Sequence, residues 1–398
     1  MEELRIKSAA LVNNQAMNFK RTLYHKIDWT NRLIGILGSR GTGKTTLQLQ
    51  KLKEITSKGE DAIYLSLDDI SFTKTRLIQI VEALRLEGVK YFFLDEVHKY
   101  PDWAREIKNI YDFYHDISIV FTGSSIINML QLPVDLSRRA LIHELPGLSF
   151  REFLEYDQNI VFNTCTLEQI IKDHQSLASK VLEKVQPVML FNAYLSNGYY
   201  PFYKENKASY PTRLLQVIRL VIDYDLAFIE NIDHQNIRKV FQLLGILSEH
   251  VPFTPNINDL SKKLAMGRNT LVQYLHYLEK ARLINNIYAS GKGFGKLEKP
   301  GKILLENTNL FEALSVINPD KGSVRESFFA SQLKNSGYNI ELPAKGDFLI
   351  NHQYTFEVGG RQKGYEQIAG IPDSYIASAD IELGVKNKIP LWLFGFLY

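Results

Sequence analysis

Residues 32–45 read RLIGILGSRGTGKT, a short apolar run that leads directly into a glycine-rich turn. The turn matches the pattern G-x-x-x-x-G-K-[ST] in full, from Gly38 at its start to Lys44 and Thr45 at its end. An apolar strand before the turn and a helical stretch after it form the context in which this pattern binds phosphate. The sequence therefore predicts a phosphate-binding loop between a buried strand and a helix.

The residue types of this loop explain the chemistry that we expect from it. Glycines let backbone N–H groups curl around a phosphate, and the start of a helix adds favourable partial positive charge. Lys44 should reach the β- and γ-phosphates of ATP, and Thr45 should ligate Mg²⁺, so ATP and Mg²⁺ are the predicted cofactors. The residues expected to line the nucleotide are Gly38, Ser39, Arg40, Gly41, Thr42, Gly43, Lys44, Thr45 and Thr46.

Outward from the loop, strand and helix patterns alternate as far as about residue 125. Apolar strands separated by helices of this length predict a parallel sheet that is covered on both faces. The expected strands are Arg32–Gly38, Ala62–Asp68, Tyr91–Val97 and Ile117–Ser125, and the expected helices are Lys44–Ser57, Lys74–Glu87 and Trp103–Tyr114.

An acidic pair ends the third expected strand, where YFFL runs into Asp95 and Glu96. Four apolar or aromatic residues before such a pair are typical of the second motif of P-loop ATPases. Asp95 is expected to hold Mg²⁺, and Glu96 to polarise the attacking water, which favours hydrolysis over nucleotide binding alone.

Polar residues also end the fourth expected strand, where Thr122 and Ser124 would point into the ligand crevice of a parallel sheet. Either residue could sense the γ-phosphate or place the water, although a serine here also suits a turn or a helix N-cap. Arg138 and Arg139 follow, and an arginine in this region could stabilise charge on the transferring phosphoryl group, in its own subunit or in a neighbour. A solvated basic turn is the alternative.

Four stretches together resemble a prokaryotic family of AAA-type (AAA+) P-loop ATPases: GSRGTGKTT, YFFLDEVHKYPDWAREIKNIYD, FTGSS and SRRALIHELPGLSFREFLEY. This family carries a winged-helix segment and a PD-(D/E)XK nuclease-like C-terminal domain of unknown function. The resemblance implies an AAA+ core with a helical lid after it. It assigns the catalytic and metal-binding roles above to Lys44, Thr45, Asp95, Glu96 and Ser124. Arg139 matches the family's arginine before the LSF segment, whereas Arg138 replaces its usual glycine.

Charge is distributed unevenly along the chain, although the total is only +3. Residues 252–310 hold nine Lys or Arg and four Asp or Glu, a local charge of +5, which leaves −2 for the remainder. A wholly basic nucleic-acid coat is therefore excluded, but a local basic patch is not. This basic segment reads as a winged helix-turn-helix: helices at 258–264 and 268–281 with a glycine turn between them, then strands at 283–288 and 302–306.

The second helix of this segment is expected to bury its leucines and to leave polar residues outside, Tyr277 among them. Arg268, Asn269 and Gln273 would suit contacts in the major groove of double-stranded DNA. Lys292, Lys296 and Lys299 in the loop between the strands would suit phosphates. Winged helices also mediate protein contacts, so an unknown protein partner is the alternative to DNA.

The C-terminal residues suggest a nuclease-like pattern that lacks one member. Asp347 and Glu357 fit an Asp, a spacer and then Glu-x-Lys, in which two carboxylates hold Mg²⁺ and the lysine steadies a hydroxide. Gly359 stands where the lysine is expected. Arg361 or Lys363 could replace it from a displaced position, and Glu326 could supply a third carboxylate. We therefore predict a nuclease-like fold that does not cut.

The whole chain is thus predicted to be an α/β P-loop NTPase of AAA+ type with a parallel sheet, followed by a helical lid, a winged helix-turn-helix and a small α/β restriction-nuclease-like domain. The expected bounds are 1–150, 151–240, 241–315 and 316–398. A strand is also expected at Pro390–Phe396. The lone Cys165, the missing signal sequence and the absence of an apolar run near ~18 residues predict a cytoplasmic protein that is not in a membrane.

Three functions are compatible with these features. The first is an ATP-hydrolysing switch that acts on DNA or on a protein partner and that could form a homo-oligomer. The second is an ATP-gated, Mg²⁺-dependent DNA nuclease. The third is a nucleotide-binding scaffold that does not hydrolyse ATP.

Overall fold

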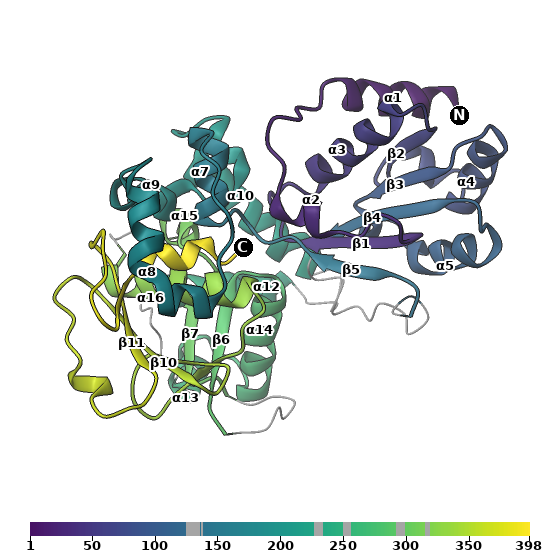
Figure 1. Cartoon of the computed structure of the whole chain (residues 1–398). Coiled ribbons are helices and arrows are strands. Elements are labelled where there is room, and N and C mark those ends of the chain that lie inside the picture. Colours follow the sequence, from purple (N-terminus) through teal and green to yellow (C-terminus); the bar gives the residue numbers. More distant parts are fainter. Residues whose placement is uncertain (125–135, 137, 227–233, 250–255, 292–298, 315–318) are drawn as a thin grey trace. The chain divides into compact units, whose positions relative to one another are not determined.

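Two units make up the chain in the computed structural model, Met1–Gly147 and Leu148–Tyr398, and each is built on its own sheet. The described residues are 1–124, 136, 138–226, 234–249, 256–291, 299–314 and 319–398 (Figure 1). The first unit ends at Gly147, and the domain bounds expected from the sequence, after residues 150, 240 and 315, remain predictions.

Five parallel strands form the sheet of the first unit in the order β2-β3-β4-β1-β5. Each strand predicted from the sequence is present, with ends that differ by one or two residues. The strands are β1 (Leu33–Gly38), β2 (Ala62–Ser66), β3 (Tyr91–Asp95), β4 (Ser118–Ser124) and β5 (Leu141–Glu144).

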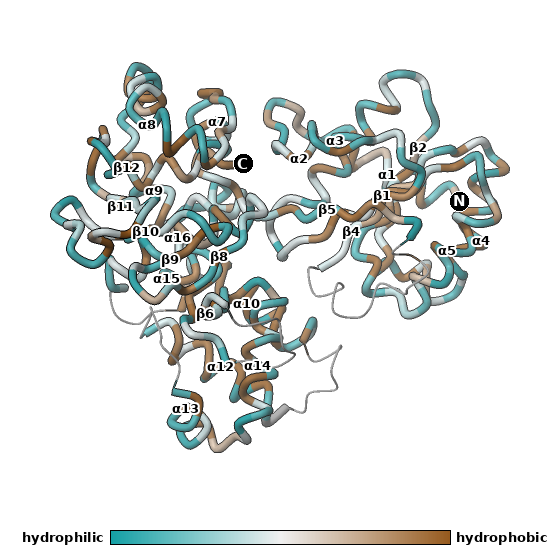
Figure 2. The backbone as a smooth tube through the Cα atoms, turned by 60° about the horizontal axis from the view of Figure 1, so that its bottom comes forward, coloured by the Kyte–Doolittle hydropathy of each residue, from teal (hydrophilic) through white to brown (hydrophobic). Residues whose placement is uncertain are grey.

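Both faces of this sheet are buried, as an apolar strand without polar alternation requires. Leu33 and Leu37 of β1 belong to one core cluster, together with α4 (Leu77–Leu86) and α5 (Trp103–Phe113). Ile34 and Ile36 point to the other face and pack with α3 (Lys44–Ser57). Figure 2 shows apolar residues running along these strands. The remaining elements of the unit are α1 (Glu2–Asn13), α2 (Thr22–Lys26), η1 (Ile70–Thr73) and η2 (Val97–Lys99).

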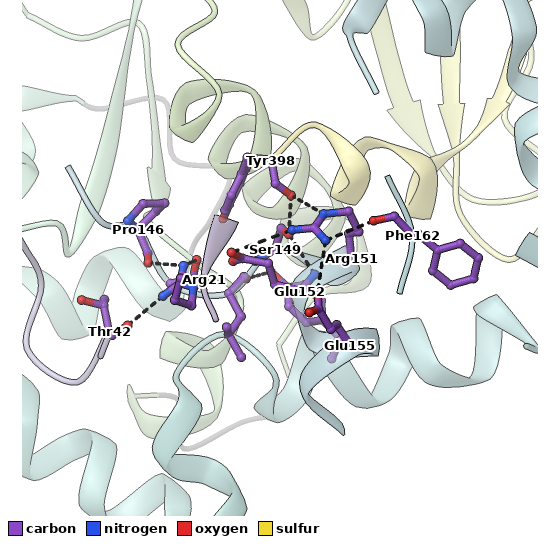
Figure 3. A network of polar contacts seen from close by, with 12 residues as sticks. Arg21, Thr42, Pro146, Ser149, Arg151, Glu152, Glu155, Phe162 and Tyr398 are labelled. Carbon is purple, nitrogen blue, oxygen red and sulfur yellow. Dashed lines mark hydrogen bonds and ion pairs between the residues drawn. The ribbon is translucent and has the colours of Figure 1, made fainter. Parts of the chain in front are cut away.

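The second unit begins with helices, as its sequence pattern predicts. They are α7 (Phe150–Gln158), α8 (Leu167–Leu182), α9 (Pro187–Asn197), η4 (Pro201–Lys204), α10 (Tyr210–Leu220), η5 (Val221–Leu226) and α12 (His234–Glu249). A capping box between Ser149 and Glu152 starts α7. The Ser149 hydroxyl also donates to the carbonyl of Tyr398, at 2.7 Å, which fixes the last residue to the start of this helix (Figure 3).

A seven-stranded mixed sheet follows, in the order β12-β11-β10-β9-β8-β6-β7. The antiparallel hairpin of β6 and β7 comes directly after α13 and α14, the two helices expected in the winged helix. Strand β6 also pairs with β8, so this hairpin and the C-terminal strands share one sheet. The elements are α13 (Ile257–Lys263), α14 (Arg268–Lys280), β6 (Ile284–Ala289), β7 (Lys302–Leu305), α15 (Asn309–Leu314), α16 (Lys321–Asn335), β8 (Ile340–Leu342), β9 (Phe348–Ile350), β10 (Tyr354–Gly359), η6 (Glu366–Ile368), β11 (Ser374–Ser378), β12 (Lys388–Pro390) and η7 (Leu391–Phe396).

The strand predicted at Pro390–Phe396 is wrong, because Leu391–Phe396 forms a 3₁₀ helix. Its side chains are buried on all sides, between α7, α8 and α16 among others. An apolar run that is buried all round carries no periodicity, so a short helix and a central strand look alike in sequence. Within the described part of the chain, no helix combines the length and the apolar character needed to span a bilayer.

Candidate functional site

The loop between β1 and α3 has the backbone that a phosphate-binding turn requires. Gly41 and Gly43 have φ angles of 82° and 95°, a region that favours glycine because it has no Cβ. Gly43 is the residue before the first turn of α3, and the first N–H groups of a helix have no acceptor within the helix itself. The predicted loop is therefore present in the predicted context.

Lys44 is buried and turned back on its own loop. Its ammonium group donates to the carbonyl oxygens of Gly38 and Ser39, both at 2.9 Å. These contacts place the charge of Lys44 inside the loop that is expected to bind the phosphate.

Asp95 is the centre of the polar contacts opposite this loop. The Thr45 hydroxyl and the Tyr64 hydroxyl each donate to its Oδ2, at 2.7 Å, and the Thr122 hydroxyl donates to its Oδ1. These donors come from α3, β2 and β4, so three elements fix one buried carboxylate. Burial, with the nearby carboxylate, raises the pKa of the Tyr64 phenol well above its ordinary value. Tyr64 therefore keeps its proton and remains a donor.

The donor set at Asp95 fits a magnesium ion. The Thr45 hydroxyl and the Asp95 carboxylate lie within hydrogen-bond distance of each other, and Mg²⁺ prefers hard oxygen ligands of these two kinds. Lys44, the residue next to Thr45, contacts the phosphate loop at Gly38. The residues predicted to hold the metal and the phosphates are therefore brought together by the fold.

Glu96 has a backbone conformation that few residues adopt. Its φ of 52° is in the left-handed region, which is uncommon for a residue with a Cβ and clusters at functional sites. The Thr122 hydroxyl accepts its backbone N–H at 3.2 Å. Its carboxylate lies 3.6 Å from Nη1 of Arg40 in the phosphate loop and 3.4 Å from Nε2 of His98. The predicted base is thus held beside the loop by two basic side chains.

Ser124 ends β4 directly beside the loop. It is buried and pairs in register with Gly38 across the parallel strands. This position suits the predicted sensing role. The sequence left Thr122 and Ser124 as alternatives, and the structure gives Thr122 a different place, between Asp95 and Glu96.

Arg139 lies near the N-terminal ends of the strands. Strands β1 and β5 are parallel, with Leu141 opposite Ile34, so Arg139 comes just before the point where both strands begin. Its guanidinium binds both carboxylate oxygens of Asp112, at 2.7 and 3.0 Å, at the C-terminal end of α5. The phosphate loop follows the opposite ends of the strands. Arg139 therefore does not lie at the phosphate loop of its own chain. Arg138 is exposed.

The residues predicted to contact DNA lie partly within the described chain. Arg268, Asn269 and Gln273 are exposed on α14. Tyr277 is not available on the same surface, contrary to expectation, because it is 6% exposed and its hydroxyl accepts a hydrogen bond from Gln273. Lys292 and Lys296 lie outside the described residues.

The acidic residues of the nuclease-like pattern are paired with lysines. The ammonium group of Lys302 in β7 lies 2.7 Å from Glu326 and 3.5 Å from Asp347. Lys363 pairs with Glu357. Burial raises the pKa of Glu326 and of Glu357, and the lysines oppose this shift. Among the described residues, no group of three or more acidic, histidine or cysteine side chains is arranged to hold a metal ion.

Lys363 occupies the space that the missing lysine would need. A Cβ added to Gly359 would lie 2.8 Å from both Cβ and Cγ of Lys363. The suggestion that Lys363 replaces the expected lysine from a displaced position is therefore consistent with the packing. Asp347 is further held by the backbone N–H of Val358, at 2.8 Å.

Sequence reasoning missed several residues around both sites. Tyr64 gains its partner Asp95 through the pairing of β2 with β3, and Lys302 gains Glu326 through the packing of α16 on β7. The side-chain amide of Gln367, which lies against Glu357, carries no sequence signal either. The sequence does not reveal these residues, because elements distant in the chain bring them to their partners.

The first unit has a phosphate-binding loop in a parallel α/β sheet, and most of it matches a known domain family. Residues 30–154 match the AAA domain family. Residues 189–321 match a second family, described as a domain of unknown function (DUF8612). An uncharacterized protein of Methanocaldococcus jannaschii, MJ1637, is 28% identical over 387 residues, which covers 90% of this chain and 81% of that protein.

Solved structures of similar fold give low scores. AMPPCP-bound DnaA from Aquifex aeolicus has a TM-score of 0.29 and 17% identity, and the match covers 65% of this chain and 84% of that one. The Hsp104–ADP complex of S. cerevisiae has a TM-score of 0.32 and 15% identity, covering 69% of this chain and 41% of that one.

Proposed function

We propose that the first unit binds Mg·ATP and hydrolyses it, and that the chain is a nucleotide-dependent switch acting on DNA or on a protein partner. The observation that carries this proposal is the gathering of Lys44, Thr45 and Asp95 at one edge of the sheet, with Glu96 beside them. The match of residues 30–154 to the AAA domain supports it.

Each residue has a distinct part in this proposal. The backbone N–H groups of the loop and Lys44 bind the phosphates, and Thr45 and Asp95 hold the magnesium ion. When bound, that ion would neutralise charge on the phosphate oxygens. Glu96 accepts a proton from the attacking water, and Ser124 contacts the γ-phosphate at the end of β4.

Two variants test the assignment. Lys44→Ala should abolish nucleotide binding, because it removes the cation expected on the phosphates. Glu96→Gln should keep binding and lose turnover by roughly 10²- to 10⁴-fold, the contribution typical of a general base. Binding is measured with a fluorescent ATP analogue and turnover by phosphate release. Undiminished hydrolysis in both variants would sink the proposal.

The same assay distinguishes the rival functions when it is run with and without double-stranded DNA. Stimulation that Arg268→Ala and Gln273→Ala weaken, and that falls as salt rises, supports action on DNA through α14. Metal-dependent DNA cleavage that disappears in Glu357→Ala supports a nuclease. ATP binding without turnover and without salt-dependent DNA affinity supports a scaffold that recruits a protein. We expect no cleavage, because Lys302 and Lys363 already balance the acidic residues.

A further inference from the structure

Arg21 is a buried cation that joins two parts of the first unit. It precedes α2 and is 5% exposed. Its Nη1 donates to the carbonyl of Thr42 in the phosphate loop, at 2.7 Å. Its Nη2 donates to the carbonyls of Pro146 and Gly147, at 2.8 and 2.9 Å. Figure 3 shows the guanidinium between the loop and this segment.

Pro146 and Gly147 are the last residues of the first unit. The segment 145–147 follows β5 and continues into the second unit. Arg21 therefore binds the backbone at the point where the chain passes from the ATPase core into the second unit. A planar guanidinium with five N–H donors suits this task, because it can bind separate acceptors in fixed directions.

A second contact links this segment to the same loop independently. The backbone N–H of Leu145 donates to the carbonyl of Leu37, at 2.7 Å, just before the loop begins. A Cβ added to Gly38 would collide with the backbone carbonyl of Leu145. The first glycine of the loop thus lies directly against the segment, with no side chain between them.

The loop also holds the cation that is expected to bind the phosphate. Lys44 donates to the carbonyls of Gly38 and Ser39, so a phosphate that binds this ammonium group competes with these two acceptors. Those carbonyls belong to the residues that adjoin the segment and that precede Thr42. A shift of the loop backbone therefore acts on Arg21 through Thr42 and on Leu145 through Gly38.

Arg21 itself is held in place from the other side. The neighbouring Tyr24 packs in the core cluster that includes α3, and its hydroxyl donates to Glu54 at 2.5 Å. Lys20 pairs with the same carboxylate, at 3.2 Å. The backbone that carries the Arg21 side chain is therefore held in place while its guanidinium contacts the loop and the segment.

From these contacts we propose that Arg21 is a positioning residue that transmits the nucleotide state of the phosphate loop to segment 145–147, where the chain leaves the ATPase core. This inference rests on the proposed nucleotide binding and adds the route by which binding reaches the rest of the chain. In this arrangement Arg21 acts through backbone carbonyls and does not touch the nucleotide.

Hydrogen exchange of the full-length chain with and without Mg·ATPγS tests the proposal. In the unsubstituted protein, the Leu145 amide should change its exchange rate by about threefold to tenfold on nucleotide addition, the factor that one net hydrogen bond provides. In Arg21→Gln this response should be lost, while the affinity for ATPγS stays within the same factor. Arg21→Lys, with a single ammonium group, should keep only part of the response.

Arg32→Gln is a matched control. Arg32 also donates to three backbone carbonyls, those of Ile117, Tyr111 and Tyr114, but at the opposite end of β1. It should lower stability without changing the response at Leu145, and thermal unfolding of each variant separates the two effects. If Arg21→Gln does not fold, the graded response of Arg21→Lys decides.

Two results would overturn the inference: an unchanged Leu145 amide in the unsubstituted protein when nucleotide binds, or a full response in Arg21→Gln. Both leave the proposed ATPase intact. Failure of the unsubstituted protein to bind ATPγS would instead remove the proposed function and this inference together.

Discussion

Thr122 joins the two acidic residues of the candidate site. Its hydroxyl donates to Asp95 and accepts the backbone N–H of Glu96, and it is fully buried in β4. Such a hydroxyl holds the metal-binding carboxylate and the predicted base in one fixed geometry. The strained backbone of Glu96, with φ of 52°, depends on neighbours of this kind.

Thr122→Val is therefore expected to disturb both residues. Valine keeps the shape but leaves the partly buried N–H of Glu96 and the buried carboxylate of Asp95 without this partner, which costs about 1–3 kcal/mol of stability. Turnover should fall by a part of the roughly 10²- to 10⁴-fold that a general base contributes, with little change in nucleotide affinity. Urea unfolding and phosphate release measure the two effects.

Thr122→Ser is the control for this change, because serine keeps the hydroxyl and loses only a methyl group. It should retain most of the turnover. Equal turnover in the valine and serine variants would show that the hydroxyl does not position Glu96.

Contiguous motifs in the sequence single out residues that the fold brings together, whereas residues outside such motifs are not found from the sequence. Lys44, Thr45 and Asp95 were predicted from local patterns and lie together. Tyr64 and Arg21 lie outside those motifs, and only the pairing of β2 with β3 and the packing of α2 bring them to the site.

Among the elements, the hairpin of β6 and β7 has an unexpected partner. Lys302 of β7 reaches Glu326 of α16 and Asp347 just before β9, and its side chain is only 11% exposed. The hairpin expected to serve DNA binding thus supplies the cation for the acidic residues of the nuclease-like pattern. Sequence patterns could not show this, because β6 and β8 pair across about 50 residues of intervening chain.

Lys302→Met is expected to lower the free energy of unfolding by about 3 kcal/mol at neutral pH, since it leaves two largely buried carboxylates without their cation. The loss should shrink on acidification. Burial already raises the pKa of Glu326, and removal of Lys302 raises it further, so the folded state then binds a proton more readily than the unfolded state. Its stability rises as pH falls through the raised pKa. Urea unfolding at pH 8 and pH 5 measures this.

Lys334→Met provides the comparison. Lys334 pairs with Glu279 at the same distance of 2.7 Å, but its side chain is 32% exposed, so the loss should be about 0.2–1 kcal/mol and nearly independent of pH. A deficit in Lys302→Met that equals this control, or that grows on acidification, would contradict the buried ion pair.

For the whole molecule, the structure divides into two units after Gly147, whereas the sequence predicts four domains, and the shared mixed sheet of the second unit was not predicted. Local patterns give the helices and most strands, but the order of seven strands depends on contacts between segments far apart in the chain. The 3₁₀ helix η7 shows the same limit, because its apolar residues fit any buried element.

A role for Arg139 in phosphoryl transfer would require a neighbouring copy of the chain, because this residue lies away from its own phosphate loop. In its own chain it binds Asp112 at the edge opposite the phosphate loop. We therefore expect Arg139→Ala to leave turnover unchanged in dilute solutions where sedimentation shows monomers. A loss of about 10³-fold or more under those conditions, the size of an arginine-finger effect, would contradict this placement.

At concentrations where the chain self-associates, mixing two variants tests whether Arg139 acts at the phosphate loop of a neighbouring subunit. Arg139→Ala supplies an intact phosphate loop and Lys44→Ala supplies an intact Arg139, so a mixture should recover turnover that neither variant shows alone. Asp112→Asn is the matched control, because it breaks the same ion pair but keeps the arginine. If Asp112→Asn loses turnover as Arg139→Ala does, the pair serves stability alone, and the arginine has no part in a neighbouring site.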